Sequence, residues 1–272
     1  MRAYRIAYDG RGYHGFQRQP TVPTVEDALF DALRSLGVLD ASSAKPPGYA
    51  AAGRTDARVS ALAQTVAFDG PEWLSPRAFN AELPADIRAW ASADVQPDFH
   101  ATHHAQRRTY TYHLHAPPEW IADERLHDAL EILSGRHDFH NFTPDDEGTV
   151  RSPHLRATRK GPFLEIRVVA DGFARELVRR LVSLATAVGR GAPLERIHRA
   201  FDEEPLPGHE GIAPAPPEPL VLTDVTYPDC SFQVDQAALE VATDIFERRR
   251  VADLVGTTVM AEIQTGLENA TQ

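Results

Sequence analysis

A carboxylate placed between two arginines is the feature of this sequence best suited to chemistry. Asp56 lies in the stretch AGRTDARVSA, residues 52–61, with Arg54 and Arg58 two positions away on either side. Neighbouring positive charge lowers the pKa of a carboxyl group, so the pattern predicts an ionised Asp56 that can act as a nucleophile or an electrostatic stabiliser. The same three residues are also typical of a surface ion pair that holds a turn, and on local chemistry alone that structural role is the commoner outcome.

Charge is distributed unevenly along the 272 residues. The formal net charge of -11 belongs entirely to residues 201–272, which contain 14 acidic and three basic side chains, whereas residues 1–200 contain 25 of each. Within the neutral part, basic residues gather in residues 1–22 and 151–180. Because local basic patches rather than net charge attract phosphate, the acidic total does not exclude RNA as a ligand.

Composition also indicates where the protein works. Only two of the 28 basic residues are lysines, Lys45 and Lys160, while acidic residues number 39. This balance indicates a salt-rich cytoplasm and a halophilic protein, although a GC-rich genome also enriches arginine. The single cysteine, Cys230, excludes an intrachain disulfide and fits a reducing cytoplasm. Since the first ten residues are too polar for a secretory signal and no apolar run approaches the roughly 20 residues that span a bilayer, we expect a cytoplasmic protein with no membrane contact.

Hydrophobic periodicity predicts two successive blocks of mixed strands and helices that divide near residue 100. Strands are expected over residues 3–8, 49–52, 64–68, 109–116, 163–170 and 220–225. Helices are expected after the caps Thr24, Ser75 and Asp123, over residues 173–188, and from Pro193. These elements predict α+β halves at residues 1–100 and 101–230 with largely antiparallel sheets, followed by an acidic helical tail over residues 231–272.

Histidines and glycines invite other chemistries that their spacing does not support. His100, His103 and His104 cluster, and His113 and His115 alternate along an expected strand, but no cysteine pair or HExxH helix accompanies them. The glycines of the segment DGRGYHG lack the spacing of a phosphate-binding loop. We therefore predict neither a metal site nor a bound nucleotide.

Several segments together resemble the TruA family of tRNA pseudouridine synthases. The stretch AGRTDARVSA is similar to the family signature AGRTDxGVHA. Further matches follow in the family's order, namely YDGRGYHGFQRQ at residues 8–19, PDFHA at 97–101, RRTYTY at 107–112, FARELVRRLV at 173–182 and LTDVTYPD at 222–229. The resemblance therefore covers most of the chain and ends before the acidic tail.

This resemblance implies roles for individual residues. Asp56 matches the nucleophile, and Tyr110 matches the tyrosine that stacks on the target base and assists proton transfer. Arg179 matches the arginine that pairs with the catalytic carboxylate, and Arg54 the one that holds the flipped-out nucleotide. From the residues alone, Tyr110 is equally well interpreted as a half-buried aromatic side chain on a strand. Arg179 is in the same way interpreted as a solvated cation on a helix. The remaining polar side chains expected to contact RNA are Arg11, Gln17, Arg18, Arg58, Arg107 and Arg108.

The resemblance also implies a fold and a reaction. Two ferredoxin-like (RRM-like) α+β halves are expected to bring their antiparallel sheets together around a basic active-site cleft, in an archaeal-type enzyme that acts on tRNA as a homodimer. The expected targets are uridines at positions 38–40 of the anticodon stem-loop. Isomerisation of uridine to pseudouridine involves neither redox change nor hydrolysis, so no cofactor is expected.

Two departures from the family pattern bear on substrate choice more than on the reaction. Arg58 and Ser60 stand where the family has glycine and histidine, and Pro219-Leu220-Val221 stands where it has a Gly-Leu-Tyr segment. The alternative function is a non-catalytic RNA-binding module of the same shape, in which Asp56 only orders its loop. A hydrolase is disfavoured because no second carboxylate is placed as its general acid–base partner.

Overall fold

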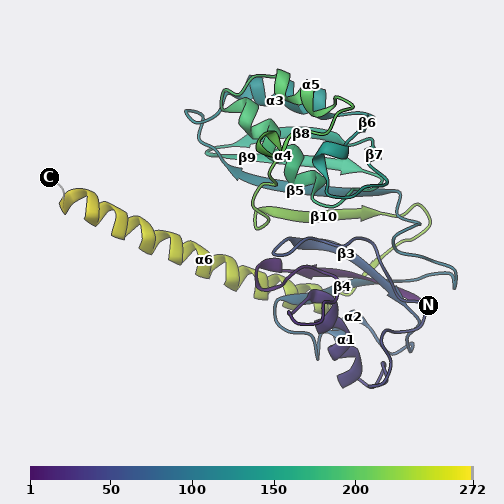
Figure 1. Cartoon of the computed structure of the whole chain (residues 1–272). Helices are drawn as coiled ribbons and strands as arrows, with labels where there is room; N and C mark the ends of the chain where they lie inside the picture. Colours follow the sequence, from purple (N-terminus) through teal and green to yellow (C-terminus); the bar gives the residue numbers. More distant parts are fainter. Residues whose placement is uncertain (271–272) are drawn as a thin grey trace.

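The computed structural model describes residues 1–270 and shows an α+β fold built on one continuous mixed sheet (Figure 1). Nine strands take part, in the order β11-β4-β1-β3-β10-β5-β9-β8, with β2 paired to β3 beside this path. Every pair in it is antiparallel except β3 with β10, which run parallel where Ser60 and Ala61 face Val221 and Leu222. The largely antiparallel character is confirmed, and the short parallel contact makes a single sheet of the strands from both parts of the chain.

The elements follow one another as two mixed blocks and a long terminal helix. The strands are β1 (Arg2–Tyr8), β2 (Ala50–Ala51), β3 (Ser60–Phe68), β4 (Ile87–Asp94), β5 (Arg107–His115), β6 (His137–Asp138), β7 (Val150–Arg151), β8 (His154–Lys160), β9 (Phe163–Ala170), β10 (Leu220–Thr226) and β11 (Gln233–Val234). The helices are α1 (Val25–Ser35), α2 (Pro76–Phe79), α3 (Asp123–Leu133), α4 (Leu177–Gly189), α5 (Glu195–Ala200) and α6 (Gln236–Ala270). Strands β6 and β7 form a separate pair.

Two of the expected helix starts are confirmed and two are corrected. Thr24 caps α1 by accepting a hydrogen bond from the Asp27 backbone, and Ser75 caps α2 in the same way. Asp123 does not cap α3, because it lies in the first turn and its carboxylate binds Arg159 instead. The helix expected over residues 173–188 begins only at Leu177, since Glu176 has a left-handed backbone with a φ of 62°.

The core lies between the sheet and the helices that cover it. In the second block, β9 alternates between buried apolar side chains such as Ile166 and the exposed Arg167, and the buried side faces α3 and α4 in the same hydrophobic cluster. In the first block, the ring of Tyr4 stacks on Phe68 at 5.2 Å and meets the edge of Phe79 from α2. The sheet thus has a firm core on both sides of the β3–β10 contact.

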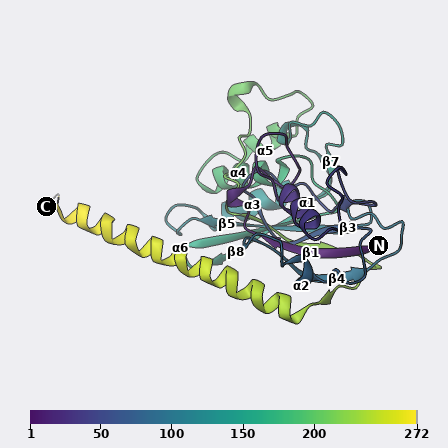
Figure 2. The ribbon, with the colours of Figure 1, turned by 90° about the horizontal axis from the view of Figure 1, so that it is seen from below.

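The terminal helix α6 leaves the body of the protein. Figures 1 and 2 show it starting beside β4 and continuing away from all other elements. Ala238 and Ala242 are buried near its start, and Arg249 contacts Asp9 over 3.3 Å. Of the tail expected over residues 231–272, Gln236–Ala270 is helical, residues 233–234 form β11, and residues 271–272 lie outside the described part of the chain. No helix among residues 1–270 combines the length and apolar character needed to span a bilayer.

Candidate active site

The loop that carries Asp56 is held by the turn-rich segment at the start of the chain. The loop connects Ala52, which is still hydrogen-bonded to β3, to the first residue of that strand, Ser60. The backbone N–H of Phe16 donates to the Thr55 carbonyl at 3.1 Å, and that of Arg58 donates to the Tyr13 carbonyl at 3.0 Å. These two bonds fix the loop on both sides of Asp56.

Two glycines allow this close approach of backbones. A Cβ atom on Gly10 would lie 2.0 Å from the Val59 carbonyl oxygen, a separation that no real side chain tolerates. Gly15 has a φ of 97°, and a Cβ there would be 3.0 Å from the Thr55 carbonyl oxygen. Gly10 and Gly15 of this segment therefore allow the Asp56 loop to pack against it.

The carboxylate of Asp56 pairs with Arg179 of α4. The Nε of Arg179 donates to Oδ2 at 2.9 Å; the Arg179 side chain is 11% exposed and that of Asp56 is 25% exposed. Arg179 also donates to Glu176 at 3.1 Å and to the Ala215 carbonyl at 3.1 Å, so its guanidinium is fixed on three sides. The other Asp56 oxygen, Oδ1, accepts no hydrogen bond within residues 1–270. The site therefore contains a carboxylate whose Oδ2 is fixed by Arg179 and whose Oδ1 is available to a substrate.

The electrostatic setting of Asp56 differs from the one that its sequence neighbours suggest. Burial raises the pKa of the Asp56 carboxyl above its ordinary value, and Arg179 opposes this shift without cancelling it. Arg54 and Arg58 are exposed, and Arg58 pairs with Glu218 at 2.9 Å. The prediction that Arg54 and Arg58 lower this pKa is therefore wrong, because the cation beside the carboxylate comes from α4.

Tyr110 lies on β5 behind the loop. The residue is 9% exposed, and its ring meets Phe173 edge-on, with centroids 5.3 Å apart. A Cβ on Gly53 would be 3.9 Å from the Tyr110 hydroxyl, which places the hydroxyl next to the Asp56 loop. Burial and the charge of Asp56 both raise the pKa of Tyr110, so the phenol stays neutral. Asp56, Tyr110 and Arg179 thus gather at one place.

The sequence did not identify Glu176 and Phe173 as parts of this site. Glu176 accepts hydrogen bonds from both Arg179 and Arg180, and its charge is one cause of the raised pKa of Asp56. The available signal was its spacing of three and four residues from two arginines, which places the three side chains on one helix face. Phe173 belongs to the segment that carries Arg179, but only the fold reveals its contact with Tyr110.

The expected RNA contacts have unequal exposure. Three of the arginines have exposed side chains, and the guanidinium group of each pairs with a carboxylate at 2.7–2.9 Å; they are Arg11, Arg18 and Arg58. Gln17 and Arg107 are exposed. Arg108 is 8% exposed and donates to the carbonyls of Ala52, Thr102 and Asp171. Its guanidinium supports the strand that leads into the Asp56 loop and is kept from solvent.

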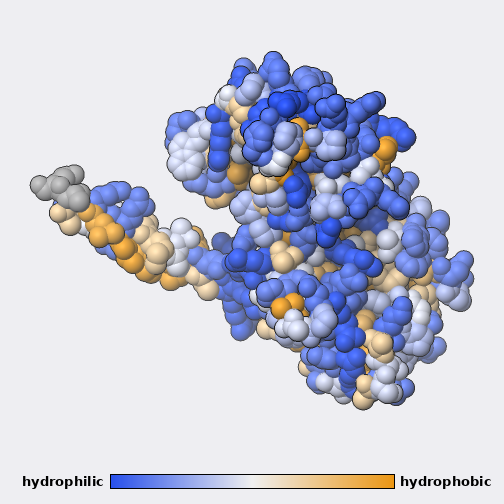
Figure 3. All heavy atoms as spheres, viewed as in Figure 1, coloured by the Kyte–Doolittle hydropathy of each residue, from blue (hydrophilic) through white to orange (hydrophobic). Residues whose placement is uncertain are grey.

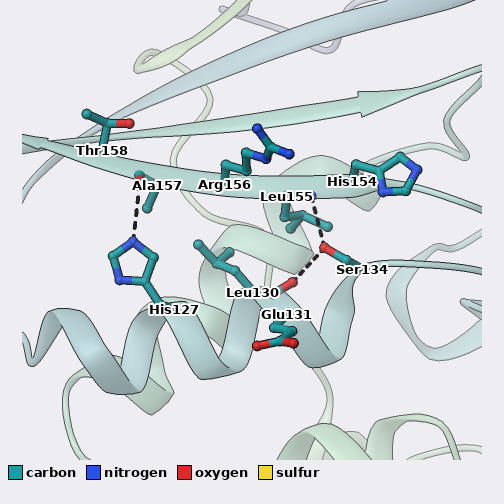
Figure 4. Close-up of a pocket in the computed structure, with 9 residues that line it drawn as sticks. All are labelled: His127, Leu130, Glu131, Ser134, His154, Leu155, Arg156, Ala157 and Thr158. Atoms are coloured by element: carbon teal, nitrogen blue, oxygen red, sulfur yellow. Dashed lines mark hydrogen bonds between the residues drawn. The ribbon is translucent and has the colours of Figure 1, made fainter.

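The hollow drawn in Figure 4 is a separate feature between α3 and β8. His127 contacts the Ala157 carbonyl at 3.2 Å, and the Ser134 hydroxyl donates to the Leu130 carbonyl at 2.7 Å while accepting from the backbone N–H of Leu155. These polar groups bind the helix to the edge strand. Neither in this hollow nor elsewhere in residues 1–270 do three His, Cys, Asp or Glu side chains gather as a metal site.

Comparison with known proteins gives consistent results. A family model described as tRNA pseudouridine synthase matches residues 129–228, which include Arg179 but not Asp56. The tRNA pseudouridine synthase A of Haloarcula marismortui is 56% identical over 98% of this chain and 100% of its own. The proteins of the same name from Natronomonas pharaonis and Halobacterium salinarum strain R1 are 59% and 54% identical, each over 92% of this chain and 94% and 93% of their own.

Among solved structures, a chain in a Cbf5-Nop10-Gar1 complex aligns with 67% of this chain and 46% of its own. Its sequence identity is 13% and the TM-score is 0.36, a likeness too distant to bear on the fold or the site.

Proposed function

The chain belongs to the tRNA pseudouridine synthase A family, and we propose that Asp56 is the nucleophile with which it isomerises uridine to pseudouridine in tRNA. The observation that carries this role is the Asp56–Arg179 pair, in which Oδ2 is bound and Oδ1 is left for the substrate. A carboxylate fixed by one charged partner keeps its orientation while the second oxygen reacts.

The reaction breaks the N1–C1′ bond of uridine and joins C1′ to C5 of the same uracil. Attack by Oδ1 at uracil C6 and attack at ribose C1′ are both compatible with this exchange. In each case the ester between Asp56 and the substrate is broken again before the product leaves. The hydrogen at C5 is lost and N1 gains one, so atoms and electrons balance without an oxidant or a hydrolytic water. The neutral phenol of Tyr110 lies where it can take part in this proton movement.

The target base must leave its stack to reach Asp56, which costs a few kcal/mol. Stacking on an aromatic ring returns about 1–3 kcal/mol per base, and Tyr110 is the ring at this site. Since Phe173 lies edge-on to Tyr110, we infer that Phe173 shifts when the base enters. Arg54 is exposed in the same loop as Asp56 and is proposed to hold the flipped nucleotide.

Four finer features of the function are proposed from the family and from composition. The targets are uridines 38–40 of the anticodon stem-loop, and the enzyme acts as a homodimer in the cytoplasm. It also works at high salt, which is supported by 39 acidic against 28 basic residues and by only two lysines. Because salt removes counterion-release energy, recognition is expected to depend more on shape and stacking than on phosphate contacts. Arg11, Gln17, Arg18, Arg58 and Arg107 remain the proposed RNA contacts.

Tritium release from tRNA labelled as [5-³H]uridine tests the reaction and the nucleophile together. The wild type is compared with Asp56→Asn in molar salt, and tRNA binding by both is measured in parallel. We expect release by the wild type, none by the variant, and similar binding. Transcripts in which uridines 38, 39 and 40 are replaced by cytidine one at a time then identify the position.

Each alternative gives a different result. Binding without release by the wild type, on any tRNA, would favour the RNA-binding module. Release by Asp56→Asn at the wild-type rate would leave the reaction intact and remove Asp56 as nucleophile.

A further inference from the structure

Two residues other than glycine have a left-handed backbone in residues 1–270, and both lie beside the candidate active site. Arg58, with a φ of 67°, is two positions from Asp56, and Glu176, with a φ of 62°, binds Arg179. A side chain makes this conformation unfavourable, and residues held in it concentrate at functional sites. The Asp56 loop is therefore strained at Arg58, at a position where the family signature has glycine.

The strained turn is closed by two backbone hydrogen bonds. The N–H of Arg58 donates to the Tyr13 carbonyl at 3.0 Å, and the N–H of Val59 donates to the Asp56 carbonyl at 3.2 Å. Rotation of Arg58 toward the common right-handed region would turn the peptide groups on either side of it and break both bonds. The position of the Asp56 carboxylate opposite Arg179 therefore depends on the conformation of Arg58.

An ion pair with the second block of the chain holds the Arg58 side chain. The face of the body seen in Figure 3 is mostly hydrophilic, and ion pairs connect its loops. The guanidinium of Arg58 lies 2.9 Å from the carboxylate of Glu218, and the two side chains are 57% and 31% exposed in that order. This contact joins the Asp56 loop to the segment that precedes β10.

The segment that carries Glu218 is itself fixed. Pro217 and Pro219 flank Glu218, and the ring of each proline restricts the backbone. The N–H of His113 on β5 donates to the Pro219 carbonyl at 3.0 Å, and that of Leu220 donates to the Pro217 carbonyl at 3.0 Å. Glu218 therefore presents its carboxylate to the strained loop from a rigid support.

We propose that Glu218 is a positioning residue of the Asp56 site and acts through Arg58. The ion pair favours the left-handed conformation of Arg58 and so keeps Asp56 in place beside Arg179. An exposed ion pair shifts a conformational equilibrium by up to about fivefold. Salt at about 1 M screens charges beyond about 3 Å, so a pair in contact at 2.9 Å persists where attraction over longer distances is lost. The consequence for the reaction rests on the proposed function, whereas the effect on the loop is independent of it.

Arg58 is also one of the proposed RNA contacts, and the two roles have different consequences. A phosphate contact is lost only when Arg58 itself is replaced, whereas the positioning role is lost when either partner of the ion pair is replaced. Glycine adopts a φ of 67° without strain, so Arg58→Gly makes the ion pair unnecessary. The effect of Glu218→Gln on the loop should therefore disappear in the Arg58→Gly background.

Amide hydrogen exchange in the free protein tests the proposal without RNA. In Glu218→Gln, the amides of Arg58 and Val59 are expected to exchange about two- to fivefold faster than in the wild type, because the loop opens more often. Equal exchange in the wild type and Glu218→Gln would overturn the proposal. The same acceleration by Glu218→Gln in the Arg58→Gly background would also overturn it.

Glu210→Gln is the matched control. Glu210 pairs with Arg199 at 2.8 Å, and these side chains are 31% and 56% exposed, close to the values of the Glu218–Arg58 pair. Within residues 1–270 no ion pair or hydrogen bond joins Glu210 or Arg199 to the Asp56 loop. Glu210→Gln is therefore expected to keep wild-type exchange at the amides of the Asp56 loop.

Single-turnover tritium release at saturating tRNA measures the consequence for the reaction. Glu218→Gln is expected to lower the rate about two- to fivefold at an unchanged Kd for tRNA, and Glu210→Gln to change neither. In the Arg58→Gly background, Glu218→Gln is expected to lower the rate no further. Faster exchange at an unchanged rate would limit Glu218 to stabilising the loop and overturn its positioning role. Absence of release by the wild type would count against the proposed reaction, while hydrogen exchange decides independently whether Glu218 acts on the loop.

Discussion

The guanidinium of Arg179 donates from Nε to Oδ2 of Asp56 over 2.9 Å, although the two residues are 123 positions apart in the chain. Asp56 precedes β3 and Arg179 lies on α4, so they come from different blocks of the sequence. The parallel contact of β3 with β10 begins at Ser60, four residues after Asp56. The site is therefore assembled at the point where the sheet becomes continuous, and it exists only in the folded chain.

The pH dependence of the reaction should report the Asp56–Arg179 pair. As the proposed nucleophile, Asp56 has to be ionised, so the single-turnover rate is expected to fall as the pH drops through its pKa, which burial holds above the ordinary 3.8. Arg179 stabilises the charged form. Replacing it with glutamine removes that stabilisation, so the acid limb of the rate profile should move to higher pH, by about one pH unit for each 1.4 kcal/mol lost.

Arg180→Gln is the matched control for this experiment. Arg180 donates to Glu176 and to the Ile212 carbonyl and makes no hydrogen bond to Asp56. The acid limb of the Arg180→Gln rate profile is expected to stay within a few tenths of a pH unit of the wild type, because Arg180 acts on Asp56 only indirectly. If Arg179→Gln left the acid limb unmoved, the group that titrates would not be Asp56.

Glu176→Gln should move the same limb in the opposite direction. The charge of Glu176 raises the pKa of Asp56, so its neutralisation lowers that pKa and extends activity to lower pH. Glutamine is also no better suited than glutamate to the φ of 62°, so backbone strain is equal in both proteins. The profile is measured by single-turnover tritium release. A shift to higher pH would show that Glu176 acts by positioning Arg179 and not through its charge.

The elements that the sequence predicted well are those with strong local signals. The caps Thr24 and Ser75 and the apolar, β-branched strand over residues 163–170 lie where expected. Strand β4, with sequence IRAWASAD, was missed because alanines give it little periodicity, although it is buried between β1 and β11. Edge strand β8 was missed because four of its seven side chains are exposed. Neighbouring strands supplied the stability that these local patterns lacked.

Three residues of the site were predictable from the sequence, whereas Glu176, Phe173 and the electrostatics of the site were not. The resemblance brought Asp56, Tyr110 and Arg179 together, and the structure places them next to one another. Arg54 and Arg58 lie two positions from Asp56 in sequence, yet both are exposed, and the pKa of Asp56 is controlled by burial and by Arg179 of α4 instead. The burial of Arg108 beside the exposed Arg107 likewise follows from strand alternation and the depth of β5 in the sheet.

Gly10→Ala should displace the loop that carries Asp56. A Cβ there would lie 2.0 Å from the Val59 carbonyl oxygen, so the backbone has to move, at a cost in unfolding free energy of about 1–3 kcal/mol. A shift of about 1 Å at Asp56 is expected to lower kcat/KM by about a hundredfold. Gly12→Ala in the same turn is the control, since nothing lies within 4 Å of its Cβ. Equal unfolding midpoints and rates for the two variants would contradict this account of the loop.

Tyr110→Phe separates stacking from hydroxyl chemistry. The Tyr110 hydroxyl makes no hydrogen bond within residues 1–270, so its removal should leave the unfolding free energy unchanged to within about 0.5 kcal/mol. If the phenol assists proton transfer, turnover falls by about 10²–10⁴-fold while tRNA binding is kept. Wild-type turnover in this variant would limit Tyr110 to stacking. Tyr110→Leu, which removes the aromatic ring, would then show the loss of turnover.

Adjacent arginines on β5 should respond in opposite ways to replacement by alanine. Arg107 is exposed, and as a phosphate contact its loss would weaken tRNA binding and reduce the slope of log K against log salt by about 0.7–0.9. Arg108 donates to three carbonyls while buried, so its loss should lower the unfolding free energy by at least about 2 kcal/mol. Denaturant unfolding and binding titrations at several salt concentrations measure both effects. A salt slope unchanged by Arg107→Ala would remove that residue from the RNA contacts, and a fully stable Arg108→Ala would show that water replaces its hydrogen bonds.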